Sequence, residues 1–249
     1  MLAFAHETRL SETTFVQPAT VSGADYRNRI FSMAGEMPLA GHPSLGTAVA
    51  VARARGVAEA GFVQQTGAGL QPIEVTSAAG SWSASMLQEP AAFGEELDAE
   101  PLLRALGLGA ADGDAELGPH VAATGLPHIL LPLAGPGSLR RIHPDAEAID
   151  RLIGDHGAFG VYAAACDPEH GRARARLFAR SAQVAEDPAT GSAAGPLCAY
   201  LYEQTGCASL EITQGVEIGR PSLLRAEMAG DRVRVSGDVV VVIDGVLRL

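Results

Sequence analysis

The sequence predicts an α+β fold that is based on antiparallel sheet and divided into two similar halves. Short alternating strands joined by glycine turns far outnumber the helical segments, a pattern typical of sheets built from hairpins. Two apolar helices each follow a glycine turn, and the two glycines, Gly41 and Gly191, lie 150 residues apart. A chain of 249 residues can form one large domain or two small ones. We therefore expect two halves, each a sheet wrapped around a buried helix.

The N-terminal half is expected to begin with a short helix that leads into S-E-T-T at residues 11–14. That segment fits either a helix cap or the exit of the helix into a strand. A helix then covers residues 47–55, and it is expected to be buried because its side chains are small and largely apolar all round. The β-meander that follows has strands at residues 62–65, 70–76 and 82–87. We place the N-terminal lobe at residues 1–90, with a C-terminal strand at about residues 238–249 joining it.

The C-terminal half, residues 91–237, is also rich in strands. The expected strands cover residues 128–133, 159–166, 175–180 and 232–236, and two further C-terminal strands cover residues 239–243 and 246–249. A short helical patch covers residues 101–106, and a helix at residues 144–155 has Pro at its start and acids in its first turn. A second buried helix is expected at residues 196–203, after the loop A-T-G-S-A-A-G.

The two helices and their glycine loops suggest a site for an anion. A glycine can simply permit a tight entry into a buried helix, and for either loop alone this is the more common explanation. The matched pair favours a functional interpretation. If the halves face each other, two helix N-termini with unpaired N–H groups converge, and together they can hold an anionic group such as a carboxylate.

Charge and residue content exclude several classes of function. The chain has 18 Lys plus Arg residues, 29 Asp plus Glu residues and a formal net charge of −11, which argues against a nucleic-acid partner. The basic run R-A-R-A-R at residues 172–176 alternates as one face of a strand, which is more often solvated than ligand-binding. All the basic residues are Arg, so a pyridoxal-phosphate Schiff base, a P-loop and a lysine nucleophile are excluded.

Cysteine and histidine spacing indicates neither a metal site nor a disulfide framework. Cys166, Cys198 and Cys207 are odd in number and have no C-x-x-C spacing, and the 7 His residues are scattered. No apolar run approaches the roughly 18 residues that a membrane helix needs. The first residues carry charges and lack the apolar core of a signal peptide. We expect reduced thiols, no membrane association and a cytoplasmic protein.

Few acids and bases lie close to the two loops in sequence. His42 belongs to the first loop, and Glu186 and Asp187 immediately precede the second. Glu12 lies in S-E-T-T, where a carboxylate used only for capping would more often follow the serine by three residues. Taken alone, Glu12 is more often an ordinary surface acid.

Four segments together resemble the phenazine-biosynthesis (PhzF-like) isomerase family. They are L-S-E-T-T-F-V, M-P-L-A-G-H-P-S-L-G-T-A, E-D-P-A-T-G-S-A-A-G-P-L and G-V-E-I-G-R-P-S, which occur in this order between Leu10 and Ser222. Each segment is weak evidence alone, but the combination is specific and spans nearly the whole chain. The resemblance implies a diaminopimelate epimerase-like fold, with two pseudo-symmetric lobes that are each an antiparallel barrel-like sheet around a central helix.

The resemblance also implies roles for individual residues. Glu12 corresponds to the family's proton-moving carboxylate, and Asp187 and His42 complete the catalytic group. The substrate-binding positions are Ser11, Gly41, Thr190, Gly191 and Ser192. Diaminopimelate epimerases and proline racemases have two cysteines at the loop–helix junctions, where this chain has Ala40 and Thr190. Racemisation by two thiols is therefore disfavoured.

The function implied is that of an isomerase that needs no cofactor and moves a proton by carboxylate acid/base catalysis. Its substrate is a small carboxylate-bearing molecule, for example trans-2,3-dihydro-3-hydroxyanthranilate. Two alternatives stay open: an epimerase or racemase of an amino acid-like substrate, and a non-catalytic protein of the same fold that binds a small acid. The resemblance also implies a homodimer.

The N-terminus departs from the family pattern. Family members have a strand about thirty residues before the S-E-T motif, whereas here Met1 is eleven residues before Glu12. We therefore expect the first lobe to lack its first strand, which would leave a sheet edge exposed.

Overall fold

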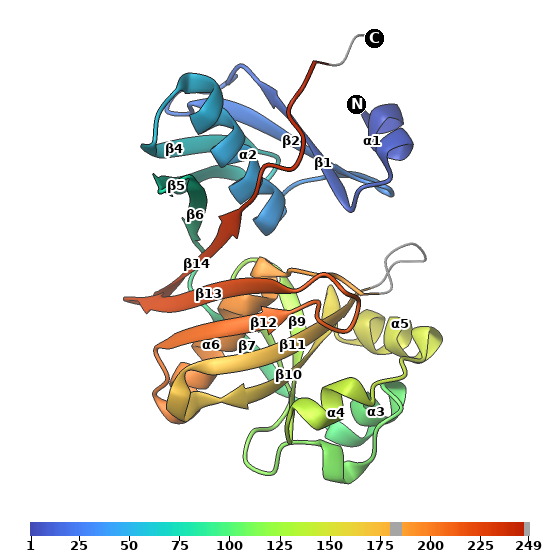
Figure 1. Cartoon of the computed structure of the whole chain (residues 1–249). Coiled ribbons are helices and arrows are strands. Elements are labelled where there is room, and N and C mark those ends of the chain that lie inside the picture. The colour runs from blue at the N-terminus through green and yellow to red at the C-terminus, as the bar shows by residue number, and fades with distance from the viewer. Residues whose placement is uncertain (180–185, 247–249) are drawn as a thin grey trace. The chain divides into compact units, whose positions relative to one another are not determined.

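A computed structural model describes residues 1–179 and 186–246, and Figure 1 shows the chain from blue at the N-terminus to red at the C-terminus. The chain forms two compact units. One combines Met1–Met86 with Ser236–Leu249, and the other is the uninterrupted segment Leu87–Val235. The lobes predicted from the sequence, residues 1–90 and 91–237, are domains that would fold independently. These limits stay a prediction.

The first unit is a sheet that packs on one long helix. Its elements are α1 (Leu2–Thr8), β1 (Glu12–Gln17), β2 (Tyr26–Ser32), β3 (Gly35–Met37), α2 (Gly41–Arg55), β4 (Glu59–Thr66), β5 (Gly69–Ala78) and β6 (Ser81–Leu87). The strand order is β1-β2-β4-β5-β6, with β3 on β2, and every pairing of β1–β5 is antiparallel except β2 with β4. Helix α2 contacts β1, β2, β4 and β5, and Leu45, Ala48 and Ala52 pack it against the apolar side chains of the strands. S-E-T-T is thus the entry into strand β1.

The second unit has a larger sheet with helices on two sides. Its elements are β7 (Ala92–Glu96), α3 (Ala99–Ala105), β8 (His120–Ala123), β9 (Pro127–Leu133), α4 (Pro136–Arg140), α5 (Ala146–Asp155), β10 (Gly160–Asp167), β11 (Arg172–Ala179), α6 (Gly191–Thr205), β12 (Ser209–Gln214), β13 (Ser222–Ala229) and β14 (Arg232–Val239), with short 3-10 turns at Ala110–Asp112 and Pro168–His170. The order is β13-β12-β11-β10-β9-β8-β7, and the pairs β9–β10 and β11–β12 are parallel. One apolar core lies around α6, and another lies under α3, α4 and α5 (Figure 1).

Helices α2 and α6 are matched elements. Each has 15 residues and begins at the predicted glycine, and each ends at a left-handed glycine, Gly56 or Gly206. A glycine at that position adopts the left-handed conformation without steric penalty. The central helix in each half is therefore confirmed, although α2 begins at Gly41 and not at residue 47, and α6 begins at Gly191 and not at residue 196. The diaminopimelate epimerase-like α+β fold is confirmed, and within the described residues the strand pairs β2–β4, β9–β10 and β11–β12 are parallel.

The C-terminal strand predictions need a correction. Strand β14 ends at Val239, and residues 240–246 form no strand. Four Val and one Ile in a row have high β-propensity, but Val240, Val242 and Ile243 are 81–89% exposed, and without a neighbouring strand propensity alone does not form a sheet. The predicted strand at residues 246–249 lies almost entirely outside the described residues. Strand β14 itself is divided, since Val235 is assigned to the second unit and Ser236 to the first.

Candidate active site

Glu12 and His42 form a close pair in the first unit. Glu12 is the first residue of β1, and His42 lies in the first turn of α2. Oε2 of Glu12 is 2.9 Å from Nε2 of His42, with the carboxylate side chain 17% exposed and the imidazole 42% exposed. The contact is an ion pair when the imidazole is protonated. The carboxylate of this pair is therefore largely buried, whereas the imidazole is exposed to solvent.

The position of this pair is fixed by packing between α2 and β1. Thr47 of α2 donates a hydrogen bond over 2.8 Å to Thr14, which lies two residues after Glu12 on β1. The hydroxyl of Ser44 donates a hydrogen bond to the carbonyl oxygen of Ala40, the N-cap residue of α2. The N–H groups of a helix's first turn have no acceptor inside the helix, so the Gly41 end of α2 is suited to hold an anion. Ser11 directly precedes β1.

In the second unit the segment before α6 is fixed by hydrogen bonds around Asp187 and Thr190. The hydroxyl of Thr190 donates to Oδ2 of Asp187 over 2.5 Å. Gln214 at the end of β12 donates to the main-chain oxygen of Asp187 over 2.8 Å and to Oγ1 of Thr190 over 2.9 Å. Oε1 of Gln214 accepts hydrogen bonds from the backbone N–H of Thr190 and from the hydroxyl of Tyr162. The polar atoms of Thr190 are thus used inside the protein, and they orient Asp187.

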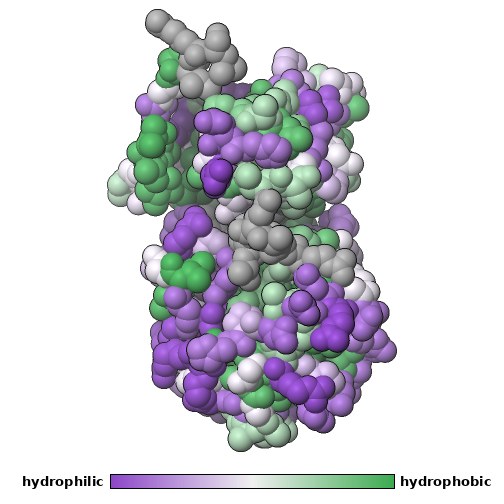
Figure 2. All heavy atoms as spheres, turned by 90° about the vertical axis from the view of Figure 1, so that its right-hand side faces the viewer, coloured by the Kyte–Doolittle hydropathy of each residue, from purple (hydrophilic) through white to green (hydrophobic). Residues whose placement is uncertain are grey.

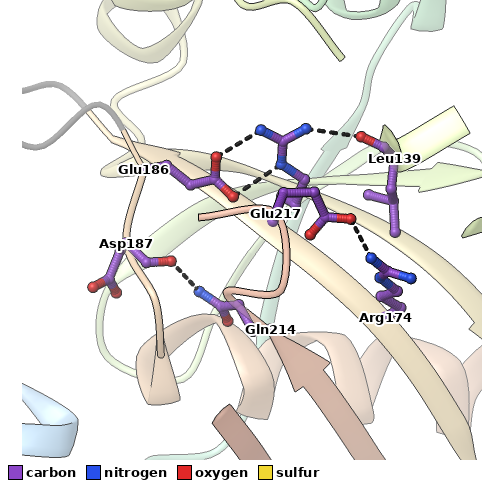
Figure 3. Close-up of polar contacts among 7 residues, drawn as sticks. Leu139, Arg174, Glu186, Asp187, Gln214 and Glu217 are labelled. Carbon is purple, nitrogen blue, oxygen red and sulfur yellow. Dashed lines mark hydrogen bonds and ion pairs between the residues drawn. The ribbon is translucent and has the colours of Figure 1, made fainter. Parts of the chain in front are cut away.

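An ion pair with Arg176 holds the residue before Asp187. Figure 3 shows Glu186 facing an arginine side chain that also reaches the carbonyl oxygen of Leu139. Arg176 donates two parallel hydrogen bonds to Glu186 at 2.9 and 2.6 Å, and the two side chains are only 9% and 8% exposed. The prediction that residues 172–176 form a solvated basic face is therefore wrong at Arg176. On that same strand Arg172 is exposed, and Arg174 is paired with Glu217 at 2.5 Å.

Ser192 lies over a fully buried histidine. Its Oγ is 3.1 Å from Nε2 of His128 on β9. His128 is 0% exposed, and burial lowers the pKa of its imidazole to about 3, so the ring is neutral near pH 7. Gln88 donates to the carbonyl oxygen of Gly191 over 2.9 Å and accepts from Thr124. The first turn of α6 is therefore surrounded by polar side chains inside an apolar core.

The structure thus places the predicted residues in two groups, one within each unit. The first set is Glu12 and His42 with Ser11 and Gly41 beside them, and the second is Asp187, Thr190, Gly191 and Ser192. No helix in the described ranges has both the length and the apolar composition needed to cross a membrane. Residues 1–179 and 186–246 also contain no group of three or more His, Cys, Asp and Glu side chains placed to hold a metal ion.

Comparison with known proteins identifies the family. The model of the PhzC-PhzF family, described as phenazine biosynthesis-like protein, matches residues 1–245. The chain belongs to the PhzC-PhzF family. It is 37% identical over 253 residues to the trans-2,3-dihydro-3-hydroxyanthranilate isomerase of Pseudomonas chlororaphis, with 96% of this chain and 85% of that relative covered. This PhzC-PhzF protein is accordingly an isomerase.

Solved structures agree with this family assignment. A predicted epimerase from Pseudomonas aeruginosa has a TM-score of 0.82 and 31% identity, and the alignment covers 98% of this chain and 88% of that one. A hydroxyproline epimerase from Agrobacterium vitis shares the fold at a TM-score of 0.65 and 17% identity, over 91% of this chain and 71% of that one. In this PhzC-PhzF isomerase, Ala40 and Thr190 are the N-cap residues of α2 and α6. Cys198 lies inside α6 and is buried, so no thiol takes either junction.

Sequence reasoning missed the residues that support the site of this PhzC-PhzF isomerase. The alternation of residues 172–176 predicts an exposed Arg176, and no motif marks Gln214 or His128. One signal was available: His128 interrupts the apolar run P-H-I-L-L-P-L, where a polar side chain needs a partner. Position 215 also requires a glycine on steric grounds. At its φ of +79° an added Cβ would lie 2.9 Å from the carbonyl oxygen of Pro188, the residue next to Asp187.

The buried imidazole predicts a pH-dependent stability. Its pKa is lowered from 6.5 to about 3 by burial, so below pH 6.5 the unfolded chain binds a proton that the folded chain does not. This group's contribution to stability is complete above pH 6.5 and is lost as the pH falls toward 3, by about 1.4 kcal/mol per pH unit. In urea unfolding between pH 7 and 4.5, His128→Gln is expected to lose less stability than wild type.

The matched control for this prediction is His143→Gln, which removes an exposed imidazole. Its free energy of unfolding should follow the wild-type pH dependence. Equal slopes for His128→Gln and wild type would show that the imidazole of His128 takes up its proton alike in the folded and the unfolded protein.

Proposed function

We propose that this isomerase moves a proton between two carbon atoms of a small cyclic carboxylate, of the trans-2,3-dihydro-3-hydroxyanthranilate type, with Glu12 as the acid/base. A carboxylate oxygen takes a proton from one carbon, the electrons of that C–H bond form a new double bond, and the old double bond accepts a proton at its far carbon. The observation that carries this proposal is the Glu12–His42 pair, a largely buried carboxylate held 2.9 Å from an exposed imidazole. The step needs no other reactant.

The remaining residues are assigned to binding and protonation of the same substrate molecule. His42, whose Nε2 lies 2.9 Å from Oε2 of Glu12, is assigned to orient this carboxylate. In the second unit the amide of Gly191 and the hydroxyl of Ser192, at the start of α6, are assigned to the substrate carboxylate, and in the first unit Gly41 is assigned to substrate binding from the family resemblance. Asp187, oriented by Thr190, helps to bind and protonate the substrate beside the step carried out by Glu12. Ser11 contacts the substrate beside Glu12.

The test is turnover of trans-2,3-dihydro-3-hydroxyanthranilate in D₂O, followed by NMR. The expected result is a product with the double bond shifted and with one new C–H position, labelled to the extent that the carboxyl proton exchanges with solvent. Loss of α-hydrogen with inversion on trans-4-hydroxy-L-proline would favour the epimerase alternative instead. Binding of anthranilate without any turnover or exchange would indicate a non-catalytic acid-binding protein. Ala40 and Thr190 at the thiol positions support the isomerase.

We propose further that the protein is a cytoplasmic homodimer. Figure 2 shows hydrophobic side chains in green at the surface of the first unit. Leu10, Val16 and Val21 of the first unit are 47–58% exposed, which is apolar area that a second copy can cover. Cys166, Cys198 and Cys207 are all free thiols, which is typical of proteins in a reducing compartment. Light scattering that gives the monomer mass would contradict the dimer.

A further inference from the structure

The buried pair of His128 and Ser192 carries an inference about the binding site. Nε2 of His128 is 3.1 Å from Oγ of Ser192, and the other ring nitrogen, Nδ1, is buried with no hydrogen-bond partner in the described chain. The ring packs against Phe159 in a T-shaped arrangement with a centroid distance of 5.6 Å. Ser192 itself is only half-buried, in the first turn of α6. One side of this serine therefore faces the imidazole, and the residue also reaches the surface of its unit.

The surroundings of the ring determine which nitrogen carries the proton. A neutral imidazole has one N–H donor and one bare acceptor nitrogen. A proton on Nδ1 would leave an N–H donor buried without a partner, a situation that native structures rarely contain. A proton on Nε2 is instead donated to Oγ of Ser192, and only an acceptor stays unpaired. The deep burial of the ring also disfavours the form with both nitrogens protonated.

We propose that His128 is a positioning residue: it donates its Nε2 proton to Oγ of Ser192 and so leaves the serine hydroxyl proton for an oxygen of the bound carboxylate. This rests on the proposed function, in which Ser192 binds the substrate. In the opposite arrangement Ser192 would donate to His128 and present only a lone pair to an anion, which would repel it. The same assignment means that His128 does not activate Ser192 as a nucleophile, since the ring has no acceptor facing the hydroxyl.

The first test is a double-mutant cycle on anthranilate binding, measured by calorimetry at pH 7. Ser192→Ala should weaken binding about tenfold, the size expected for loss of one hydrogen bond to a charged group. In His128→Asn the side chain is too short for its amide to reach Oγ, so the affinity for anthranilate should fall by a similar factor. His128→Gln keeps an N–H group near the position of Nε2, so its affinity for anthranilate should be close to that of wild type. In the Ser192→Ala background, His128→Asn should have no further effect.

The outcomes separate this inference from the proposed function. If Ser192→Ala binds anthranilate as tightly as wild type, the assignment of Ser192 to the binding site is wrong, and the role of His128 fails with it. If Ser192→Ala weakens binding but His128→Asn has the same effect in both backgrounds, His128 acts through the structure in general, and only the positioning role is overturned. Near-UV circular dichroism of each variant checks that the fold is retained.

The second test needs neither a ligand nor a variant. Long-range ¹H–¹⁵N NMR correlations identify which ring nitrogen of a histidine carries the proton. For His128 we expect the proton on Nε2 and an unchanged signal between pH 5 and 8. A proton on Nδ1 would overturn the inference whatever the binding results.

Discussion

Replacing Glu12 with Gln is expected to lower kcat about 10²–10⁴-fold, the range for loss of a positioned general acid or base. An amide has the size of the carboxylate but cannot accept a proton from carbon and return it. Glu12 is 17% exposed and sits at the start of β1, so a substitution of equal size disturbs little of the packing. The measurement is turnover of trans-2,3-dihydro-3-hydroxyanthranilate, together with the affinity for anthranilate, which should be retained.

The matched control is Glu7→Gln, which changes an exposed carboxylate on α1 without touching β1. This variant should turn over the substrate at the wild-type rate. Full activity of Glu12→Gln in the same assay would remove Glu12 from the mechanism and would leave Asp187 as the remaining carboxylate to test.

Replacing Arg176 with Met is expected to lower the free energy of unfolding by about 3–5 kcal/mol, the range measured when one partner of a buried ion pair is removed. The substitution leaves the carboxylate of Glu186 in a site where it is 8% exposed and has lost both of its guanidinium hydrogen bonds. It also frees the carbonyl oxygen of Leu139. Urea unfolding monitored by circular dichroism gives the difference.

Arg172→Met is the matched control, because Arg172 lies on the same strand but is exposed. Its effect should stay within about 0.5 kcal/mol. In the double variant Arg176→Met, Glu186→Leu the uncompensated charge is gone, and much of the stability should return. Equal effects of the two single arginine variants would mean that the Arg176–Glu186 pair contributes nothing in solution.

The central helices could be predicted because their signal is local. Small apolar residues on all sides indicate burial, and the glycines mark where α2 and α6 begin. The start of α6 was nevertheless predicted too late, at Pro196, since proline inside a helix removes a backbone hydrogen bond. The structure includes Pro196 in the helix, where ten of the fifteen residues are buried. Packing of that helix in the core outweighs the local preference of one residue.

The supporting residues of the site could not be predicted because their partners are distant in sequence. His128 meets Ser192 across 64 residues, and Gln88 meets Gly191 across 103. The alternation of residues 172–176 does put three arginines on one face of β11, but burial of that face at Arg176 depends on Glu186 and on Leu139 of α4. Spacing along one strand cannot reveal what covers it. By contrast, Glu12 and His42 were found by resemblance, and the structure places them in contact.

The split of β14 has a consequence for how the protein is made. The first unit needs residues from Ser236 onward, whereas the second unit is complete once Val235 has been synthesised. Domains generally fold as units while the chain emerges from the ribosome. The N-terminal stretch Met1–Met86 leaves the ribosome first but must wait, with its apolar side chains incompletely covered, until the rest of the polypeptide has followed. We therefore expect the second unit to complete its fold before the first, although its residues are synthesised later.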